Sequence, residues 1–399
     1  MRILYVAPGI PIPGSHGGST HTFEVARGLS LLGHKVLIVA KRENLRQKKR
    51  EAIEGMEVYR VLPLIPRKLL EWLALPSILW LARRWKPDVI LERYYNFGGG
   101  GIITGALLGI PSVLEVISPV VDHPGSKKAL IDHLFIIRPM KRYREWLCRR
   151  SKAIISPIRE ILPEGLPEGK IHLLHTGANL ALFSPERYRK DEERRKLGIP
   201  KEMVVITFLG SFRSWHGVLD FIEAGKMVLS SKRKNILFLM IGSGPLYKKT
   251  EEIITRSKLK EHFLLTGKVP YCDVPAFLSA SDIGVAPFNS EGFPSLKLGF
   301  YWSPLKIFEY LAMGLPVITI DIPPLNEIVR DKEEGLLYPE GNIQALAERM
   351  LYLIENEAER RKMGKKARAR STLFSWERQT KKIDDILKKV VRYADIDNH

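Results

Sequence analysis

Short apolar runs alternate with helical patterns along the first 177 residues of the chain. The runs are rich in Val, Ile and Leu, and in chain order they read RILYVAP, KVLIVAK, EVYRVLP, DVILERY, SVLEVIS, KAIISP and KIHLLHTG. Helix candidates lie between most of them, for example over 20–32 and 128–150. Continuous apolar strands separated by helices are typical of a parallel sheet that is covered on both faces. The first part of the chain is therefore predicted to be an α/β unit.

The same alternation then restarts with the runs VVITFLGS, ILFLMIGSG, FLLTGKV, DIGVAPF, PVITID and GLLYP. Two successive series predict an α/β protein with two doubly wound, Rossmann-like domains, over 1–178 and 179–374. The segment 175–190 mixes Gly, Asn and Pro and is the linker candidate. Ser375 is predicted to cap a final helix within 375–399. A cleft between the domains is expected, because ligands bind beyond the carboxyl ends of parallel strands.

Composition supports this organisation. A chain of 399 residues is too long for one ordinary core and fits two domains. The hydrophobic content of 45% and the charged content of 27% are typical of soluble globular proteins. Cys148 and Cys272 lie far apart, in no disulfide-like or zinc-like spacing, so no metal site is expected. A reducing, cytoplasmic compartment is favoured.

Neither a signal peptide nor a membrane span is expected. The amino terminus, MRILYVAPGIPIPG, has too short an apolar stretch for a signal peptide and is typical of a first buried strand. The longest apolar segment, 69–82, falls short of about 20 residues and contains Glu71 and Pro76.

The net charge is +19, with the larger excess in the first half of the chain. Such a field suits nucleic acid, an anionic lipid surface or a phosphorylated substrate, and an ordinary solvated basic surface is the alternative. No basic motif with interleaved aromatic residues is present, so nucleic acid is not an expected partner.

Glycine-bearing turns follow several predicted strands. Gly17 and Gly18 stand before an amphipathic helix, whose first N–H groups favour an anion, although an ordinary strand-to-helix turn is the alternative. His16 and His21 flank this turn, and for each a place in a loop or on the helix surface is favoured over catalysis.

Two further turns occur in the second series. The turn LGSFRSWHGV contains Gly210, with Arg213 and His216 as candidate phosphate contacts. The turn MIGSGPL contains Gly242 and Gly244, a pattern too short to be a dinucleotide fingerprint. The glycines are expected to let the backbone approach a ligand closely.

The stretch YWSPLKIFEYLAMGLPVITID, residues 301–321, predicts a turn, a short helix, a glycine stop and a buried strand. Lys306 and Glu309 lie three residues apart, on one face of that helix. A carboxylate can accept hydrogen bonds from two neighbouring ribose hydroxyls, and an ammonium can balance a diphosphate leaving group. The alternative is an ordinary surface salt bridge.

The loop after the strand SVLEVIS contains Asp122 and His123, each a candidate general acid or base or a group that orients a sugar hydroxyl. Loops carry such residues routinely, so an ordinary loop is the alternative. The triplet DID at 395–397 is not interpreted as a metal site, because it lies in the terminal tail.

Taken together, the motifs resemble family 4 glycosyltransferases of the GT-B fold over nearly the whole chain. The matching segments are GG at 17–18, LGHKVLIVA, LGSFRSWHGV, IGSGPL, TGKVPYCDVPAFLSASDIGVAPF, SPLKIFEYLAMGLPVI and FSWE. The resemblance implies transfer of a sugar from a nucleotide-diphosphate donor, usually with retention of configuration and without a required metal. It also implies that the second domain binds the donor, the first binds the acceptor, and the final helix crosses back to the first domain.

The resemblance also implies roles for individual positions. Glu309 matches the ribose-binding glutamate of the family, and Ser303, Leu305 and Lys306 match the turn that contacts the diphosphate. Val269 matches the position where the main chain contacts the base. Asp122 or His123 lies near the catalytic histidine of the acceptor domain, and with Lys306 these form the expected catalytic set.

Two departures from the family pattern stand out. The family often has a second glutamate eight positions before Glu309, where this chain has Tyr301, and Glu291 is a less favoured substitute. The usual Arg and Lys of the phosphate turn fall at Ser211 and His216. Positive charge is reduced there unless Arg213 replaces it.

These observations predict a retaining glycosyltransferase that uses a UDP- or GDP-linked sugar, with no cofactor, and a glycan or lipid-linked acceptor such as a cell-envelope glycan. The basic, aromatic segments 65–87 and 127–150 favour contact with an anionic membrane, so the cytoplasmic protein is expected at the inner face of the membrane. Packing of both segments on the sheet is the alternative. The rival functions are a sugar-nucleotide epimerase and a non-catalytic binder of nucleotide sugars or nucleic acid.

Overall fold

The structure is a computed structural model that describes residues 1–14, 17–61, 73–95, 97–118, 120, 138–231, 235–290, 300 and 304–397. The chain divides into two compact units. Unit 1 combines the amino-terminal part, as far as Thr176, with the carboxyl-terminal segment that begins at Trp376. Unit 2 is formed by Gly177–Phe300 and Pro304–Ser375.

Unit 1 contains an eight-stranded sheet in the described residues, in the order β3-β4-β2-β1-β5-β6-β7-β8. All neighbouring strands are parallel except β3 and β4, which are antiparallel. The strands are β1 (Arg2–Pro11), β2 (Lys35–Lys41), β3 (Arg50–Ile53), β4 (Met56–Val61), β5 (Val89–Tyr94), β6 (Ser112–Val116), β7 (Ala153–Ser156) and β8 (Ile171–Leu173). The helices are α1 (Gly17–Leu31), α3 (Leu75–Trp85), α4 (Gly100–Leu108), α6 (Arg138–Arg150) and α15 (Trp376–Asp397).

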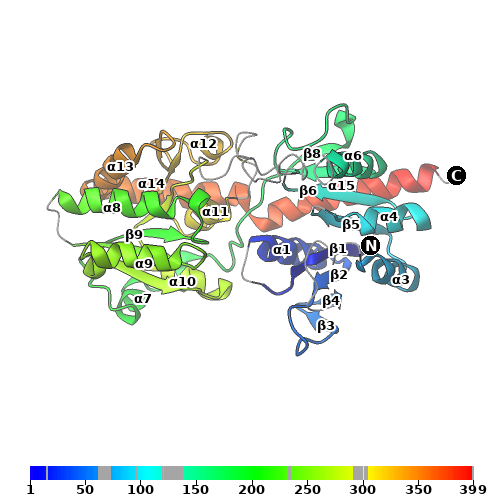
Figure 1. Ribbon diagram of the computed structural model, residues 1–399, viewed down its shortest axis with the longest axis horizontal. Coiled ribbons are helices and arrows are strands. Elements are labelled where there is room, and N and C mark those ends of the chain that lie inside the picture. The colour runs from blue at the N-terminus through cyan, green and yellow to red at the C-terminus, as the bar shows by residue number, and fades with distance from the viewer. Residues whose placement is uncertain are drawn as a thin grey trace. The chain divides into compact units, whose positions relative to one another are not determined.

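The last helix, α15, packs against α1 within unit 1 (Figure 1). The two helices approach closely at Gly28, where a Cβ atom would lie 2.5 Å from the Oγ1 atom of Thr380. His34 Nε2 lies 2.7 Å from Asp384 Oδ1, so a buried polar contact joins the start of the chain to its end. The prediction that the final helix returns to the first domain is confirmed.

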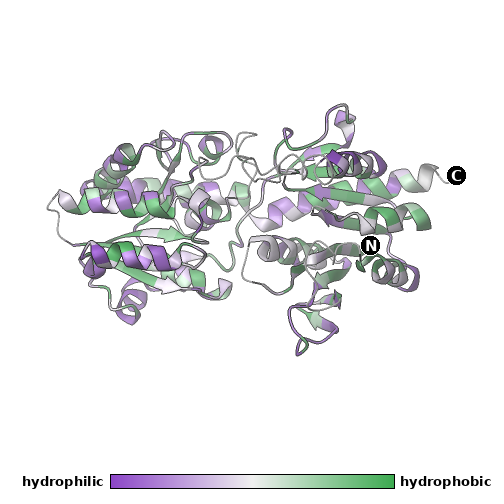
Figure 2. Ribbon diagram, in the orientation of Figure 1, coloured by the Kyte–Doolittle hydropathy of each residue, from purple (hydrophilic) through white to green (hydrophobic). Residues whose placement is uncertain are grey.

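Unit 2 contains a six-stranded sheet in the described residues, in the order β11-β10-β9-β12-β13-β14, with every pair parallel. The strands are β9 (Val204–Leu209), β10 (Ile236–Ile241), β11 (Phe263–Gly267), β12 (Ile283–Ala286), β13 (Val317–Ile320) and β14 (Gly335–Tyr338). The strand order reverses between β9 and β12, which is the topological switch point of the sheet. The strands of both units are largely apolar in Figure 2, as two-face burial requires.

The helices of unit 2 lie along this sheet (Figure 1). They are α7 (Lys190–Lys196), α8 (Val218–Ser230), α9 (Tyr247–Arg256), α10 (Val274–Ser279), α11 (Leu305–Ala312), α12 (Leu325–Ile328), α13 (Ile343–Glu355) and α14 (Glu357–Ser371). The 3₁₀ turns in the described residues of both units are η2 (Glu168–Lys170), η3 (Pro185–Arg187), η4 (Ser214–His216), η5 (Lys260–His262), η6 (Tyr271–Asp273) and η8 (Thr372–Phe374).

The structure confirms two Rossmann-like α/β domains and adds one element that the apolar pattern missed. Strand β3 has the sequence REAI, which offers no continuous apolar run, and it is held as an antiparallel edge partner of β4. The first helix begins at Gly17, so the two glycines are its first residues and do not precede it. Over the described residues, none of the helices is both long and apolar enough to cross a membrane.

Candidate active site

Several turns in unit 2 meet at the carboxyl ends of β9, β10 and β12, beside the first turn of α11. Gly210 follows β9 with φ +136°, and Gly242 follows β10 with φ +129°. A Cβ atom on Gly242 would lie 2.0 Å from the carbonyl oxygen of Gly210, and one on Gly244 would lie 2.7 Å from the backbone nitrogen of Phe212. The glycines were expected to allow the close approach of a ligand. The close contact between the two turns already explains why glycine is needed at these positions.

Lys306 emerges from the first turn of α11 and is buried, with 6% of its surface exposed. Its Nζ atom lies 4.4 Å from the centroid of the Phe208 ring and 4.9 Å from that of Phe288. Among the described residues, this Nζ atom has no hydrogen-bond partner. Burial lowers the pKa of Lys306 to about 7, although Glu309 opposes the shift. The amine is thus enclosed by aromatic rings.

Glu309 lies one helical turn further along α11 and is 5% exposed. Burial raises the pKa of its carboxyl group to about 8, against the opposing effect of Lys306. Both side chains are buried, and the Lys306 Nζ atom makes no hydrogen bond to Glu309 or to any other described residue, so the interpretation as an ordinary surface salt bridge is wrong. Burial favours the neutral form of both groups while they remain without charged ligands.

Tyr310 anchors this helix to the sheet. Its hydroxyl oxygen accepts a hydrogen bond from the backbone N–H of Leu209, at 2.7 Å, and the hydroxyl donates to the carbonyl oxygen of Thr207 at 3.2 Å. Burial raises the pKa of Tyr310 well above its usual value. Sequence reasoning missed this positioning role, and the available signal was a tyrosine beside Glu309 in a buried helix.

His216 and Arg213 both lie in the turn after β9, but His216 is partly buried and Arg213 is exposed. His216 Nδ1 lies 3.4 Å from Ser211 Oγ, and the His216 ring is 6.0 Å from Phe288 between centroids. Burial lowers the pKa of His216 well below its usual value, and Lys306 and Arg213 lower it further. His216 is therefore neutral near pH 7. Arg213 is exposed, with its Cζ atom 5.0 Å from the centroid of the Trp215 ring.

Only some of the other residues predicted to bind the donor lie in the described part of the chain. Leu305 is the first residue of α11, and Val269 is half-buried, two residues after β11. Their proposed contacts with a donor remain predictions. The remaining predicted residues lie outside the described part of the chain: His16, Asp122, His123, Glu291, Tyr301 and Ser303.

In unit 1, Gly17 and Gly18 open α1, and His21 lies one turn later. His21 was expected on the surface or in a loop, and this prediction is wrong, because only 6% of the residue is exposed. Its Nε2 atom contacts the Glu115 carboxylate, and its ring lies 5.1 Å from the Trp376 ring between centroids, edge to face. The ring of Trp376, at the start of α15, therefore helps to cover His21.

Sequence reasoning also missed the cluster around Glu115. Tyr5 donates its hydroxyl hydrogen to Glu115 Oε2 at 3.0 Å, and an Arg93 guanidinium nitrogen lies 3.6 Å from the same oxygen. Burial alone would raise the pKa of Glu115, but the contacts with His21 and Arg93 outweigh burial and lower the pKa. Arg93 is always charged and so favours the ionised carboxylate. For His21, burial and Arg93 lower the pKa, so we assign a neutral ring that donates to Glu115.

Within the described ranges there is no group of three or more His, Cys, Asp or Glu residues arranged to hold a metal ion.

Two sequence families match the chain. Residues 15–182 match Glycosyltransferase Family 4, and residues 189–370 match Glycosyl transferases group 1. Together, these matches account for most of both units.

Curated relatives of the chain are also named as glycosyltransferases. The chain is 33% identical over 171 residues to an uncharacterized glycosyltransferase of Methanocaldococcus jannaschii, and the match spans 43% of this chain and 44% of that protein. It is 24% identical over 288 residues to the UDP-Gal:alpha-D-GlcNAc-diphosphoundecaprenol alpha-1,3-galactosyltransferase of Escherichia coli, over 71% of this chain and 70% of that protein. The first of these matches spans less than half of the relative's length.

Solved structures show the same fold. Sucrose-phosphate synthase from Thermosynechococcus elongatus superposes with a TM-score of 0.78 at 18% identity, over 98% of this chain and 99% of the other. The Anabaena protein HepE in complex with UDP and glucose superposes with a TM-score of 0.72 at 18% identity, over 98% and 100%. With both units matched to glycosyltransferase families, the chain belongs to the family 4, group 1 glycosyltransferases, and its fold is GT-B.

Proposed function

We propose that the chain transfers a sugar from a UDP- or GDP-linked donor to a glycan or lipid-linked acceptor, with retention of anomeric configuration. One observation carries the proposal. The buried amine of Lys306, which has no hydrogen-bond partner among the described residues, lies near the buried Glu309 carboxyl group at the switch point of the unit 2 sheet. Ligands of open α/β sheets bind at this point, beyond the carboxyl ends of the strands. A nucleotide diphosphate can supply an anion for the amine and ribose hydroxyls for the carboxyl group.

The diphosphate is the natural counterion of Lys306. An anion beside a buried amine favours its charged form, so Lys306 is protonated in the complex and stabilises the charge that develops on the leaving diphosphate. Arg213 is exposed at the neighbouring turn and adds a second positive charge. With two cations at this position, we propose that the reaction needs no metal ion.

Glu309 is proposed to accept hydrogen bonds from the ribose hydroxyls, which favours its carboxylate form. In the transfer step, the bond between C1 of the sugar and the diphosphate oxygen breaks. The acceptor oxygen then bonds to C1 on the same face, and the hydroxyl proton is released. Asp122 and His123 remain the proposed acid–base residues of the acceptor domain.

The relatives support a nucleotide-sugar donor. The Escherichia coli relative is named for a UDP-linked galactose donor and a diphosphoundecaprenol-linked acceptor, and the Anabaena structure holds UDP and glucose. A Streptomyces fradiae relative, 25% identical over 287 residues, is named as a 2-deoxystreptamine N-acetyl-D-glucosaminyltransferase. These names favour a transferase over the epimerase alternative. The acceptors that they name include a lipid-linked sugar and a small molecule.

Helix α6 carries exposed aromatic and basic residues, as expected of a helix that contacts a membrane holding a lipid-linked acceptor. Tyr143 and Trp146 stack on this helix at 6.2 Å between centroids, and 46% of Trp146 is exposed. The same helix carries exposed basic residues at Arg138, Arg142, Arg149 and Arg150, among others. We propose that this face contacts an anionic membrane at its cytoplasmic side. Sedimentation of the protein with anionic vesicles at low salt, but not with neutral vesicles, supports the contact, and equal sedimentation with both contradicts it.

The function is tested with a panel of UDP- and GDP-sugars. Thermal shift identifies the donor, because a ligand that binds the folded state raises its melting temperature. The donor is then incubated with lipid-linked and glycan acceptors in the presence of EDTA, and the anomeric configuration of the product is determined. Transfer with retention in EDTA is the expected result. Turnover of the donor into an epimerised sugar nucleotide without acceptor would overturn the proposal.

A further inference from the structure

A cavity of about 780 Å³ opens in unit 2 at the ends of the strands that lie opposite the candidate donor site. It lies at the amino ends of β9, β12 and β13, with walls that come largely from α7 and α14. The residues of the candidate donor site lie at the carboxyl ends of the same strands. A strand of six residues such as β9 spans about 20 Å, so this cavity is a separate site.

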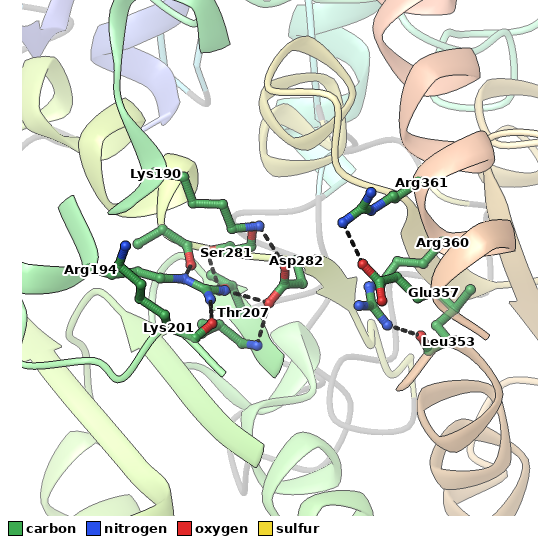
Figure 3. A network of polar contacts seen from close by, with 12 residues as sticks. Lys190, Arg194, Lys201, Thr207, Ser281, Asp282, Leu353, Glu357, Arg360 and Arg361 are labelled. Atoms are coloured by element: carbon green, nitrogen blue, oxygen red, sulfur yellow. Dashed lines mark hydrogen bonds and ion pairs between the residues drawn. The ribbon is translucent and has the colours of Figure 1, made fainter. Parts of the chain in front are cut away.

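On one wall of the cavity, two basic side chains form ion pairs with the same carboxylate (Figure 3). Lys190 Nζ lies 2.5 Å from Asp282 Oδ1, and an Arg194 guanidinium nitrogen lies 2.6 Å from Asp282 Oδ2. The backbone N–H of Val205 also donates to Asp282 Oδ2, at 2.7 Å. Two positive charges therefore share one negative charge at this point. Lys201, Asp191 and Glu202 also line this side, and the lining as a whole holds seven basic and four acidic side chains, so the cavity is net positive.

The opposite wall carries cations that no carboxylate neutralises. The Arg360 guanidinium donates to the carbonyl oxygens of Leu353, at 2.6 Å, and Ile354, at 3.1 Å. Lys365 lies on the same helix and is exposed. In the part of the chain that the structure describes, no carboxylate pairs with Arg360 or Lys365, and Glu357 is already paired with Arg361.

The two walls act on each other electrostatically. The pKa of Lys190 is lowered by burial first and also by the charges of Arg194 and Arg360, although Asp282 opposes these effects. Figure 3 shows Lys190, Arg194 and Asp282 facing Arg360 and Arg361 across the cavity. Repulsion between the walls is relieved when an anion lies between them.

We propose that this cavity binds a small anion with at least two phosphate groups, one at each wall. The volume is within the range of small-molecule sites, about 300–1,000 Å³. Guanidinium groups suit phosphate because their planar donors match its oxygens. This site adds to the donor site and does not depend on it, since the two share no residue.

Calorimetric titration of the full chain with inorganic pyrophosphate tests the proposal. The variant R360Q/K365Q removes the unpaired cations of one wall, and R256Q/K260Q removes one Arg and one Lys that lie exposed elsewhere in unit 2. Loss of a charged phosphate contact reduces affinity by roughly tenfold or more. We expect at least that reduction in R360Q/K365Q, and a change within about twofold in the matched control.

Two further results make the test decisive. Arg360 contacts backbone carbonyls, so R360Q/K365Q can lose stability, whereas K365E changes only an exposed side chain and is expected to weaken pyrophosphate binding by a similar factor. Inorganic phosphate reaches one wall only and is expected to bind at least tenfold more weakly than pyrophosphate. Unchanged pyrophosphate affinity in both R360Q/K365Q and K365E would overturn the proposal.

Discussion

The Nζ atom of Lys306 lies 4.4 Å from the centroid of the Phe208 ring and has no hydrogen-bond partner among the described residues. Phe208 belongs to β9, and Lys306 to the first turn of α11, so the contact lies where that helix begins beside the end of the strand. An aromatic face attracts a cation but offers no strong acceptor. The amine is thus positioned by packing and left available to an anionic ligand.

Donor affinity is expected to depend on pH in a bell-shaped manner. The complex needs charged Lys306, whose pKa is about 7 in the free protein, and ionised Glu309, whose pKa is about 8. Ligand binding raises the pKa of Lys306, so its contribution is present below pH 7 and is lost as pH rises. Binding lowers the pKa of Glu309, so its contribution is present above pH 8 and is lost as pH falls. Calorimetry with a sugar nucleotide should therefore show maximal affinity between pH 7 and pH 8.

Single variants separate the two limbs of this profile. Lys306→Met should abolish the loss of affinity at alkaline pH, and Glu309→Gln should abolish the loss at acidic pH. The sugar nucleotide is the suitable ligand because its esterified diphosphate does not titrate in this range. A profile that keeps both limbs in Lys306→Met contradicts the assignment of the alkaline limb.

Tyr310→Phe is expected to destabilise unit 2. The change leaves the buried N–H of Leu209 without its acceptor, which costs about 1–3 kcal/mol of unfolding free energy. Thermal denaturation monitored by circular dichroism should show a lower melting temperature. The control is Tyr352→Phe, at a tyrosine that is 43% exposed on α13, where the change should have little effect. Equal melting temperatures for the two variants would show that the Tyr310 hydroxyl does not anchor α11.

Gly242→Ala tests the contact between the two glycine turns. Its Cβ atom would lie 2.0 Å from the carbonyl oxygen of Gly210, at a backbone φ of +129°, so both turns must shift. Backbone strain alone costs of order 1–3 kcal/mol. The variant should melt at a lower temperature and bind the donor more weakly. Gly169→Ala is the control, because its Cβ atom would meet nothing within 4 Å, and a comparable loss there would argue against the explanation.

Much of the fold could be predicted because burial on both faces of a parallel sheet leaves continuous apolar runs. The run VVITFLGS became β9 and its turn, and the spacing of Lys306 and Glu309 correctly placed both on α11. Strand β3 could not be predicted, because REAI pairs with β4 at the sheet edge and needs no apolar run.

The environment of individual side chains was harder to predict, because it depends on elements far away in sequence. His21 lies in a polar stretch of α1 that a surface helix would also show, and it is buried because Trp376 covers it. Likewise, the helical spacing of Lys306 and Glu309 is compatible with a surface pair. Only the tertiary contacts with Phe208 and Phe288 show that the amine is enclosed.

The central claim is that Glu309 and Lys306 bind the nucleotide-diphosphate part of a sugar donor. The most direct test compares the affinity of UDP and GDP for the wild-type protein and for Glu309→Ala by titration calorimetry at pH 7.5. Loss of charged hydrogen bonds to the ribose should weaken the preferred nucleotide by at least about tenfold, while circular dichroism stays unchanged. Unchanged nucleotide affinity in Glu309→Ala, with a folded protein, would contradict the account.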